Sequence, residues 1–390
     1  MMSANQVSVI VIGGVGQMGR HVCRLLARFE SVARVDVADI AQDKAALLAS
    51  ELGPKGNAVV LDATDVDALR DAFADIDFVV NALGPFNHFA LPILTTAIEA
   101  GVDYIDVCDD WEATVDLLAL DGRARERGVR AIIGLGMSPG LTNLLAKRAA
   151  EELDEVDRMV TGWPVAGTRV EHEDQYDVGR SATAAAEHLI LQCSGKIRVF
   201  AGGDRAEVTP LQKVEIDYPG IGAKDARSLG HPEPITLPMT FRGIDESLNV
   251  MTGPTWVFDR LAEITRRYEA GEIDLREAAS LASGMSRPAD APREPRDNMP
   301  TAWAQVTGTT NGERRVVSAH LSAWPPHFMG GATGYPAAVG VDLLARGASV
   351  APGVVAPEQA FDPTEFFAAL GDHVENGPVR DYVVVVSVPA

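Results

Sequence analysis

IVIGGVGQMGR, residues 10–20, joins an apolar run to a helical pattern through four glycines. It contains the spacing G-x-G-x-x-G from Gly14 to Gly19, which in a strand–turn–helix setting cradles the pyrophosphate of a dinucleotide. Gly14 is expected to permit the tight turn, Gly16 to let the backbone approach the phosphates, and Gly19 to let the helix pack closely, with Gly13 an extra glycine. The alternative is a glycine-rich turn that binds nothing. The expected cofactor contacts in this loop are Gly14, Val15, Gly16, Gln17, Met18 and Gly19.

The first 150 residues alternate short apolar runs with amphipathic helical patterns. Strands are predicted at 7–12, 34–38, 58–61, 78–82, 104–107 and 130–134, and helices at 17–29, 42–52, 66–74, 91–100, 111–127 and 141–152. Strict alternation of this kind, with strands that are apolar throughout, predicts a doubly wound parallel sheet covered by helices on both faces. The fold class is therefore α/β, with residues 1–150 as a Rossmann dinucleotide-binding domain.

Beyond this domain, the regular alternation of strands and helices ends. Strands are predicted at 158–165, 196–200, 212–218 and 235–241, a helix at 255–282, and a hairpin at 302–321 around Asn311-Gly312. This mixture predicts an α+β domain over residues 151–330, suited to substrate binding and dimerisation. Residues 331–390 form a separate C-terminal segment, whose helix is expected from Ala337 to Arg346 with Pro336 in its first turn.

Charge and cysteine content exclude several classes of protein. The formal net charge is −21, so binding to nucleic acid or to anionic lipid is not expected. No apolar run is long enough for a membrane span, and no signal peptide is evident at the N-terminus. The three cysteines, Cys23, Cys108 and Cys193, are far apart, which favours buried thiols in a reducing cytoplasm over disulfides or a zinc site.

An acidic residue follows the glycine loop at the distance expected of a ribose ligand. Asp39 lies about 20 residues beyond Gly19, at the end of the second predicted strand. A carboxylate there accepts hydrogen bonds from the adenosine ribose and repels a 2′-phosphate, and Ile40 follows it in place of an arginine. The sequence therefore favours NAD over NADP. The alternative is that Asp39 caps the next helix.

Two further loops follow predicted strands and complete the expected nucleotide site. Asp62 and Ala63 come after the third strand, beside the expected adenine. The loop after the fourth strand reads NALGPF, and it lies where the strand order reverses, which is where such folds bind ligands. Its expected contacts with the nicotinamide ribose are Asn81, Leu83, Gly84 and Pro85. The alternative for the loop after the fourth strand is a turn that binds nothing.

GMSPG, residues 136–140, imitates the nucleophile elbow of a serine hydrolase. An oxyanion hole there would use the backbone N–H of the residue after the serine, and Pro139 has none. The segment is better explained as a turn into the helix at 141–152. Thr142 and Asn143 are then candidate substrate contacts.

The chain resembles the saccharopine dehydrogenase-like family, which includes lysine 6-dehydrogenases and carboxynorspermidine or saccharopine reductases. The resemblance lies in VIGGVGQMG (11–19), NALGPFNHFALPILTTAIEAGVDYIDVCDD (81–110), GMSPGLTNLLA (136–146), GHPEPITLP (230–238) and ATGYPAAVGVDLLARG (332–347). It implies a Rossmann domain with an inserted α+β domain, a last helix that returns to the Rossmann domain, and a homodimer. It also implies hydride transfer between NAD(P) and a carbon that bears an amino or imino nitrogen. By position, the resemblance extends the nicotinamide contacts over Asn81–Phe86, which adds Ala82 and Phe86.

These observations predict an NAD(P)-dependent dehydrogenase acting on the C–N bond of an amino acid or related amine. Oxidation requires a neutral amine and hence a proton acceptor, for which Asp109 and His172 are the candidates. Asp109 could instead belong to the cap of the following helix, with Asp110 the better cap. Arg180 is a candidate clamp for a substrate carboxylate, and no metal site is expected. The alternatives are a reductase that condenses an aldehyde with an amine, and an NAD(H)-binding regulator without catalysis.

Overall fold

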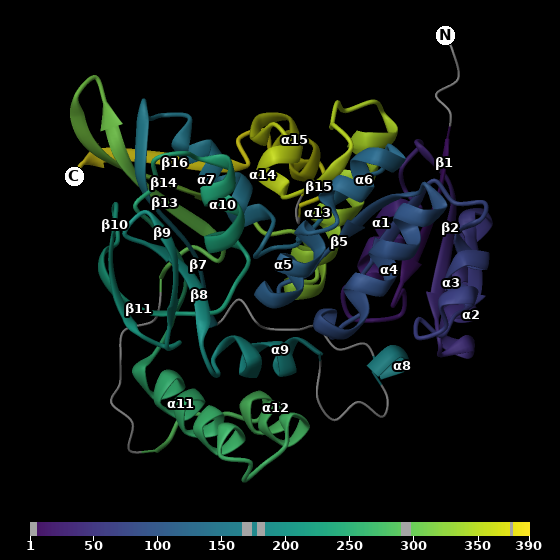
Figure 1. Cartoon of the computed structure of the whole chain (residues 1–390), viewed down its shortest axis with the longest axis horizontal. Helices are drawn as coiled ribbons and strands as arrows, with labels where there is room; N and C mark the ends of the chain where they lie inside the picture. The colour runs from purple at the N-terminus through teal and green to yellow at the C-terminus, as the bar shows by residue number, and fades with distance from the viewer. Residues whose placement is uncertain (1–5, 166–173, 178–183, 290–297, 375–376) are drawn as a thin grey trace. The chain divides into compact units, whose positions relative to one another are not determined.

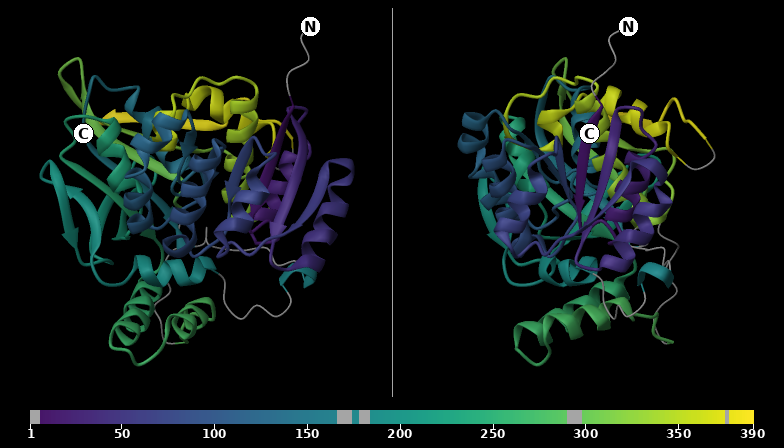
Figure 2. Two further views of the ribbon diagram at one scale, coloured as in Figure 1. Left: turned by 45° about the vertical axis from the view of Figure 1, so that its right-hand side comes forward. Right: turned by 90° about the vertical axis from the view of Figure 1, so that its right-hand side faces the viewer.

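The computed structural model describes residues 6–165, 174–177, 184–289, 298–374 and 377–390. The chain forms two compact units. The first comprises Met1–Leu144, Arg169–Val178 and Ala323–Tyr382, and the second comprises Leu145–Thr168, Gly179–Ser322 and Val383–Ala390. Figures 1 and 2 follow the chain through both units.

The first unit is built on a parallel sheet of seven strands, in the order β15-β6-β5-β4-β1-β2-β3. The strands are β1 (Val7–Ile12), β2 (Val32–Asp39), β3 (Gly56–Val60), β4 (Phe78–Asn81), β5 (Asp103–Asp106), β6 (Arg130–Ile132) and β15 (Gly353–Val355). The chain moves outward from β1 in one direction and from β4 in the other, so the strand order reverses between these two neighbours. The predicted α/β fold class is confirmed, and β15 is a strand that the sequence pattern did not predict.

Helices cover both faces of this sheet, as the right-hand view of Figure 2 shows around the purple strands. Among the described helices, α1 packs on α13, while α3, α5 and α6 pack on α4. These helices are α1 (Gly19–Leu26), α2 (Gln42–Glu51), α3 (Val66–Phe73), α4 (Phe86–Ala100), α5 (Trp111–Leu118), α6 (Asp121–Arg127), α7 (Leu141–Ala150), α13 (Phe328–Ala345), α14 (Pro357–Ala360) and α15 (Pro363–Gly371). The single helix expected over 111–127 is therefore two helices, and α4 begins earlier than expected.

Helix α13 also differs from expectation. It begins at Phe328 and contains Pro336 in its interior, whereas the sequence predicts a start at Ala337 with Pro336 in the first turn. Its glycines explain the longer helix. A Cβ on Gly334 would lie 2.8 Å from the carbonyl oxygen of Met18, and one on Gly330 would lie 2.6 Å from Cδ2 of His21. Close packing on α1 therefore outweighs the poor helix propensity of glycine and proline.

The second unit contains a mixed sheet of nine strands, with the path β10-β11-β12-β7-β13-β14-β16 and with β8 and β9 branching from β12. Its strands are β7 (Glu155–Pro164), β8 (Ile197–Ala201), β9 (Asp204–Val208), β10 (Lys213–Tyr218), β11 (Gly222–Ser228), β12 (Glu246–Thr252), β13 (Trp303–Thr310), β14 (Glu313–Leu321) and β16 (Val383–Pro389). Trp303, Tyr218 and Val160 belong to its buried apolar core. The hairpin expected around Asn311-Gly312 is confirmed, since β13 pairs with β14 there.

Two predictions for the second unit were wrong. The strand expected over 235–241 is the helix α10 (Glu233–Thr240), because prolines are tolerated in the first turn of a helix, and a short apolar run fits either structure. The helix expected over 255–282 is divided into α11 (Thr255–Glu269) and α12 (Leu275–Ser283). Gly271 adopts a positive φ between them, and Asp274 caps α12. The remaining described helices are α8 (Asp174–Asp177), which belongs to the first unit, and α9 (Ala184–Gln192).

Within the described ranges, no helix combines the length and the apolar character that crossing a bilayer requires. All three cysteines are buried and free, as predicted.

Candidate nucleotide site at the carboxyl edge of the parallel sheet

The glycine loop connects β1 to α1, as predicted. Gly13, not Gly14, is the residue with positive φ, at +72°. The positive φ that was expected at Gly14 is therefore found at Gly13, which forms the turn and is not an extra glycine. Gly14 is needed for space instead, because its Cβ would lie 2.9 Å from Cγ1 of Val37 on β2.

Gly16 and Gly19 close the turn upon itself. The amide of Gly16 donates to the carbonyl of Gly13 across 2.9 Å. A Cβ on Gly19 would overlap that same carbonyl oxygen and lie 3.0 Å from Cα of Gly14. Helix α1 therefore starts directly against the turn, and no described side chain caps it. A helix N-terminus of this kind offers its N–H groups and its dipole to a phosphate.

Asp39 ends β2 beside this loop. The amide of Gly14 donates to the carbonyl of Ala38 (3.0 Å), so the two strand ends are tied together. The carboxylate of Asp39 is half-buried and accepts a 3.0 Å bond from the amide of Ala41, the residue before α2. Asp39 therefore binds the residue at the cap position of α2 but does not occupy that position itself. The side chain of Ile40 is 70% exposed.

The loop after β3 is organised by two aspartates. Asp62 accepts hydrogen bonds from the amide and the hydroxyl of Thr64, and these bonds hold the pKa of its carboxyl below the usual value. Ala63 is buried. Asp65 caps α3 by accepting bonds from the amides of Asp67 and Ala68, as the sequence pattern indicates.

The loop after β4 contacts the glycine loop. The amide of Ala82 donates to the carbonyl of Ile12 (2.9 Å), and a Cβ on Gly13 would lie 3.0 Å from Cα of Leu83. Residues 82–85 are half-buried, whereas Phe86 and Asn81 are buried. The structure therefore brings the predicted phosphate loop and the predicted nicotinamide loop together at the point where strand order reverses.

Asn81 does not direct its side chain to open space. Its Nδ2 donates to the hydroxyl of Tyr104 (3.1 Å), and its Oδ1 accepts from the amide of Leu83 (3.0 Å). The hydroxyl of Tyr104 donates in turn to Asp106 (2.9 Å), the last residue of β5. Sequence reasoning missed Tyr104 and Asp106 as members of the site.

Asp106 is fully buried. Its Oδ1 accepts from the amides of Cys108 (3.0 Å) and Gly134 (2.6 Å), which lie on the loops after β5 and β6. Burial disfavours the charged form and raises the pKa of Asp106 to about 6, although these hydrogen bonds favour the carboxylate. The nearby charge of Asp109 adds to the increase.

The loop after β6 contains the hydrolase-like sequence 136–140. The carbonyl of Pro139 accepts from the amide of Gly136, which forms a closed turn without an oxyanion hole at Pro139. Thr142 and Asn143 are both fully buried. Asn143 accepts from the amide of Gly140 (2.9 Å) and donates to Glu358 of α14 (2.9 Å), which is 215 residues further along the chain.

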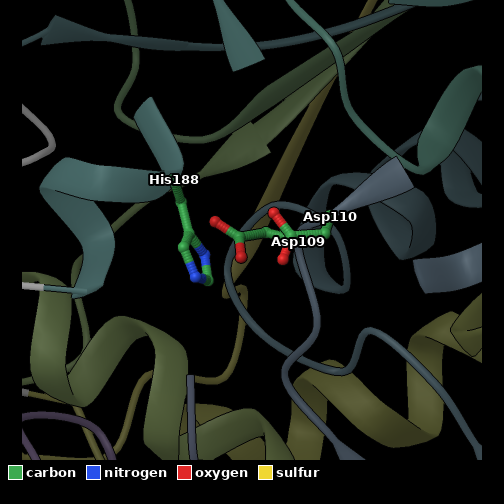
Figure 3. A group of neighbouring side chains, drawn as sticks. All are labelled: Asp109, Asp110 and His188. Carbon is green, nitrogen blue, oxygen red and sulfur yellow. The ribbon is translucent and has the colours of Figure 1, made fainter. Parts of the chain in front are cut away.

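Asp109 is the candidate proton acceptor that lies among the described residues. Figure 3 shows Asp109 and Asp110 on the loop before α5, and His188 on α9 of the second unit. Asp109 is half-buried. Asp110 occupies the cap position of α5, but its carboxylate accepts from the amide of Asn87 in α4 (3.2 Å). His172 and Arg180 lie outside the described residues.

Similarities to known proteins agree with this geometry. Residues 9–132 match the profile of a family described as the saccharopine dehydrogenase NADP binding domain. The trans-acting enoyl reductase of Mycobacterium ulcerans (strain Agy99) is 25% identical over 154 residues, which are 37% of this chain and 36% of that protein. The trans-acting enoyl reductase of Mycobacterium leprae (strain TN) is 24% identical over 132 residues, 33% of this chain and 32% of that protein. The chain therefore spans about a third of the length of these curated relatives.

A solved structure resembles the whole chain. Apo saccharopine dehydrogenase (L-Glu forming) from Saccharomyces cerevisiae superposes with a TM-score of 0.65 and 16% identity, over 98% of this chain and 100% of that one. At this identity the likeness establishes the fold. Residues 9–132 therefore match the saccharopine dehydrogenase NADP binding domain, and the chain has a fold of the saccharopine dehydrogenase type.

Proposed function

We propose that the protein is an NAD(P)-dependent oxidoreductase that transfers hydride at a carbon bearing an amino or imino nitrogen, in an amino acid or related amine. The observation that carries the proposal is the contact between the glycine loop and the loop after β4 at the reversal of strand order. The family match over residues 9–132 supports the nucleotide, and the likeness to saccharopine dehydrogenase supports the C–N bond.

The residues present fit the nucleotide. Gly16 is half-buried beside the N-terminus of α1, and α1 begins there without a side-chain cap, so its N–H groups could face a pyrophosphate. The nicotinamide would supply or accept the hydride. The loop after β4 would orient it, and Asp109 or His172 would take the proton from the amine, while Arg180 would hold a substrate carboxylate.

We propose NAD as the preferred cofactor, although the family description names NADP. Asp39 supports this preference, because a carboxylate at the end of β2 pairs with ribose hydroxyls and repels a 2′-phosphate. Calorimetric titration should show tighter binding of NAD than of NADP to the wild-type chain, and Asp39→Asn should narrow the difference by about tenfold. Equal affinities of the wild-type chain for both cofactors would remove this role.

Two other reactions are specific candidates. The first is the reverse reaction, in which an aldehyde and an amine condense and the imine is reduced. The second is reduction of a carbon–carbon double bond, which the names of the mycobacterial relatives favour. Both use the same nucleotide loops and differ in the substrate that the remainder of the protein accepts.

The test is turnover with a substrate panel. Amino acids and polyamines would be offered with NAD, aldehyde–amine pairs with NADH, and 2-enoyl thioesters with NADH and NADPH, while the absorbance of the reduced nicotinamide is followed. The proposal expects turnover in one of the first two arms. Turnover of only the thioesters would assign the enoyl reaction, and nucleotide binding without any turnover would favour a regulator.

We also propose that the chain acts as a homodimer. Light scattering at several concentrations tests this, with a monomeric mass at all of them as the contrary result.

A further inference from the structure

Asp106 is connected to three loops at the edge of the sheet where the nucleotide is proposed to bind. One carboxylate oxygen accepts the amides of Cys108 and Gly134, and the other accepts the hydroxyl of Tyr104. Tyr104 accepts in turn from Asn81, whose own oxygen holds the amide of Leu83. A continuous series of hydrogen bonds thus runs from β6 through β5 to the loop after β4.

The three side chains in this series are inaccessible to ligands. Asn81, Tyr104 and Asp106 each have an exposed fraction of 0%. Buried polar groups are costly unless they are hydrogen-bonded, and here each side chain has at least two partners. Loss of the Tyr104 hydroxyl would leave Nδ2 of Asn81 without the acceptor of this bond and Oδ2 of Asp106 without its donor, so the arrangement has few low-energy alternatives.

The series ends at the loop that contacts the glycine turn. Leu83 is held by Asn81, and the Cα of Leu83 occupies the space beside Gly13. A shift of Leu83 would therefore open or close the gap between the two loops. Asp39 and the loop after β3 lie on the other side of β1, where this series of hydrogen bonds has no member.

We propose that Asp106, Tyr104 and Asn81 are positioning residues, which hold the loop after β4 in place for the nicotinamide half of the cofactor and leave the adenosine half unaffected. This inference rests on the proposed nucleotide-binding function. The three residues act through Leu83 and its neighbours, without touching the cofactor.

ADP-ribose tests the proposal, because it carries the adenosine and the diphosphate but no nicotinamide. Calorimetric titrations of the full chain with NAD and with ADP-ribose would compare the wild type with Tyr104→Phe. The proposal expects the Kd for NAD to rise about tenfold and the Kd for ADP-ribose to change less than about twofold. Equal weakening of both ligands, or no weakening of NAD, would overturn it.

Tyr382→Phe is the matched control. Tyr382 is also a buried tyrosine of the first unit, but it packs against Phe367 of α15. Its loss of a hydroxyl should leave the ratio of the two dissociation constants unchanged, and a change as large as that of Tyr104→Phe would also count against the proposal.

Asn81→Ala provides a second route if Tyr104→Phe does not fold. It removes the loop end of the series and leaves the bond between Tyr104 and Asp106 intact. The same selective loss of NAD affinity is expected, and an equal loss of ADP-ribose affinity would contradict it. A wild-type chain that binds neither NAD, NADP nor ADP-ribose would refute the proposed function itself, which is a separate outcome.

Discussion

The loop after β1 and the loops after β4, β5 and β6 lie at the same edge of one sheet, but they are held in place by different means. The first is shaped by missing side chains, since Gly13, Gly14 and Gly19 bring backbone against backbone. The others are shaped by a buried carboxylate and the donors around it. Glycines leave the backbone of the loop after β1 without side chains that would cover it. The buried hydrogen bonds fix the other three loops through side chains that a ligand cannot reach.

The largest effect is expected where the glycine loop is filled. Gly19→Ala places a methyl group against the carbonyl of Gly13, so the helix must move away from the turn. We expect a loss of about 3 kcal/mol in the free energy of unfolding and loss of measurable nucleotide binding. Urea unfolding and calorimetry measure the two effects.

Gly122→Ala is the control for this substitution. Gly122 lies in α6, and a Cβ there would meet no atom within 4 Å. It should stabilise the chain by about 0.5 to 1 kcal/mol. Similar results for the two variants would show that glycine is not required at Gly19.

The buried carboxylate should be recognised by its pH dependence. Folding raises the pKa of Asp106 from 3.8 to about 6, so the folded protein binds this proton more tightly than the unfolded chain does. The stability gained from that proton is fully present below pH 3.8 and is lost as the pH rises through 6. Asp106→Asn has no such titration. We expect its stability relative to the wild type to increase by about 2 to 3 kcal/mol between pH 4 and pH 7. Urea unfolding at a series of pH values measures this difference, and a constant difference would mean that Asp106 titrates normally.

The smallest effect is expected at an exposed cap. Asp65→Ala removes two hydrogen bonds at the start of α3 and should cost about 1 kcal/mol in unfolding free energy. Asp65→Asn keeps an acceptor and should lie within a few tenths of a kcal/mol of the wild type. A larger loss for Asp65→Ala than for Gly19→Ala would show that the exposed cap contributes more to stability than the close packing at Gly19.

The same contrast explains what the sequence could predict. A chain that must approach itself closely requires glycine, and glycine spacing is visible in the sequence, so the loop from Gly13 to Gly19 was located correctly. The choice between Gly13 and Gly14 as the turn residue was wrong, because adjacent glycines offer the same freedom and only packing on Val37 separates them.

Asp106 was missed for a physical reason. Its partners at Cys108 and Gly134 are backbone amides, which any residue provides, and Asn81, which bonds to its third partner Tyr104, is remote in sequence. The sequence shows an aspartate at the end of a strand but does not show whether its carboxylate is solvated or buried. In the second unit, the apolar run over 235–241 predicted a strand where α10 lies, because a short apolar run fits either structure and proline is tolerated in the first turn of a helix.

The packing of α13 on α1 sets the order of events during synthesis. The glycine loop and α1 leave the ribosome early, but residues 328–345, which pack on α1, follow about 300 residues later. At roughly 5 to 20 residues per second, this interval is about 15 to 60 s. During it, the surface of α1 around His21 and Met18 has no neighbour from α13. Helix α1 therefore gains its α13 neighbour only after most of the second unit has been translated, and a pause within that unit would lengthen this interval.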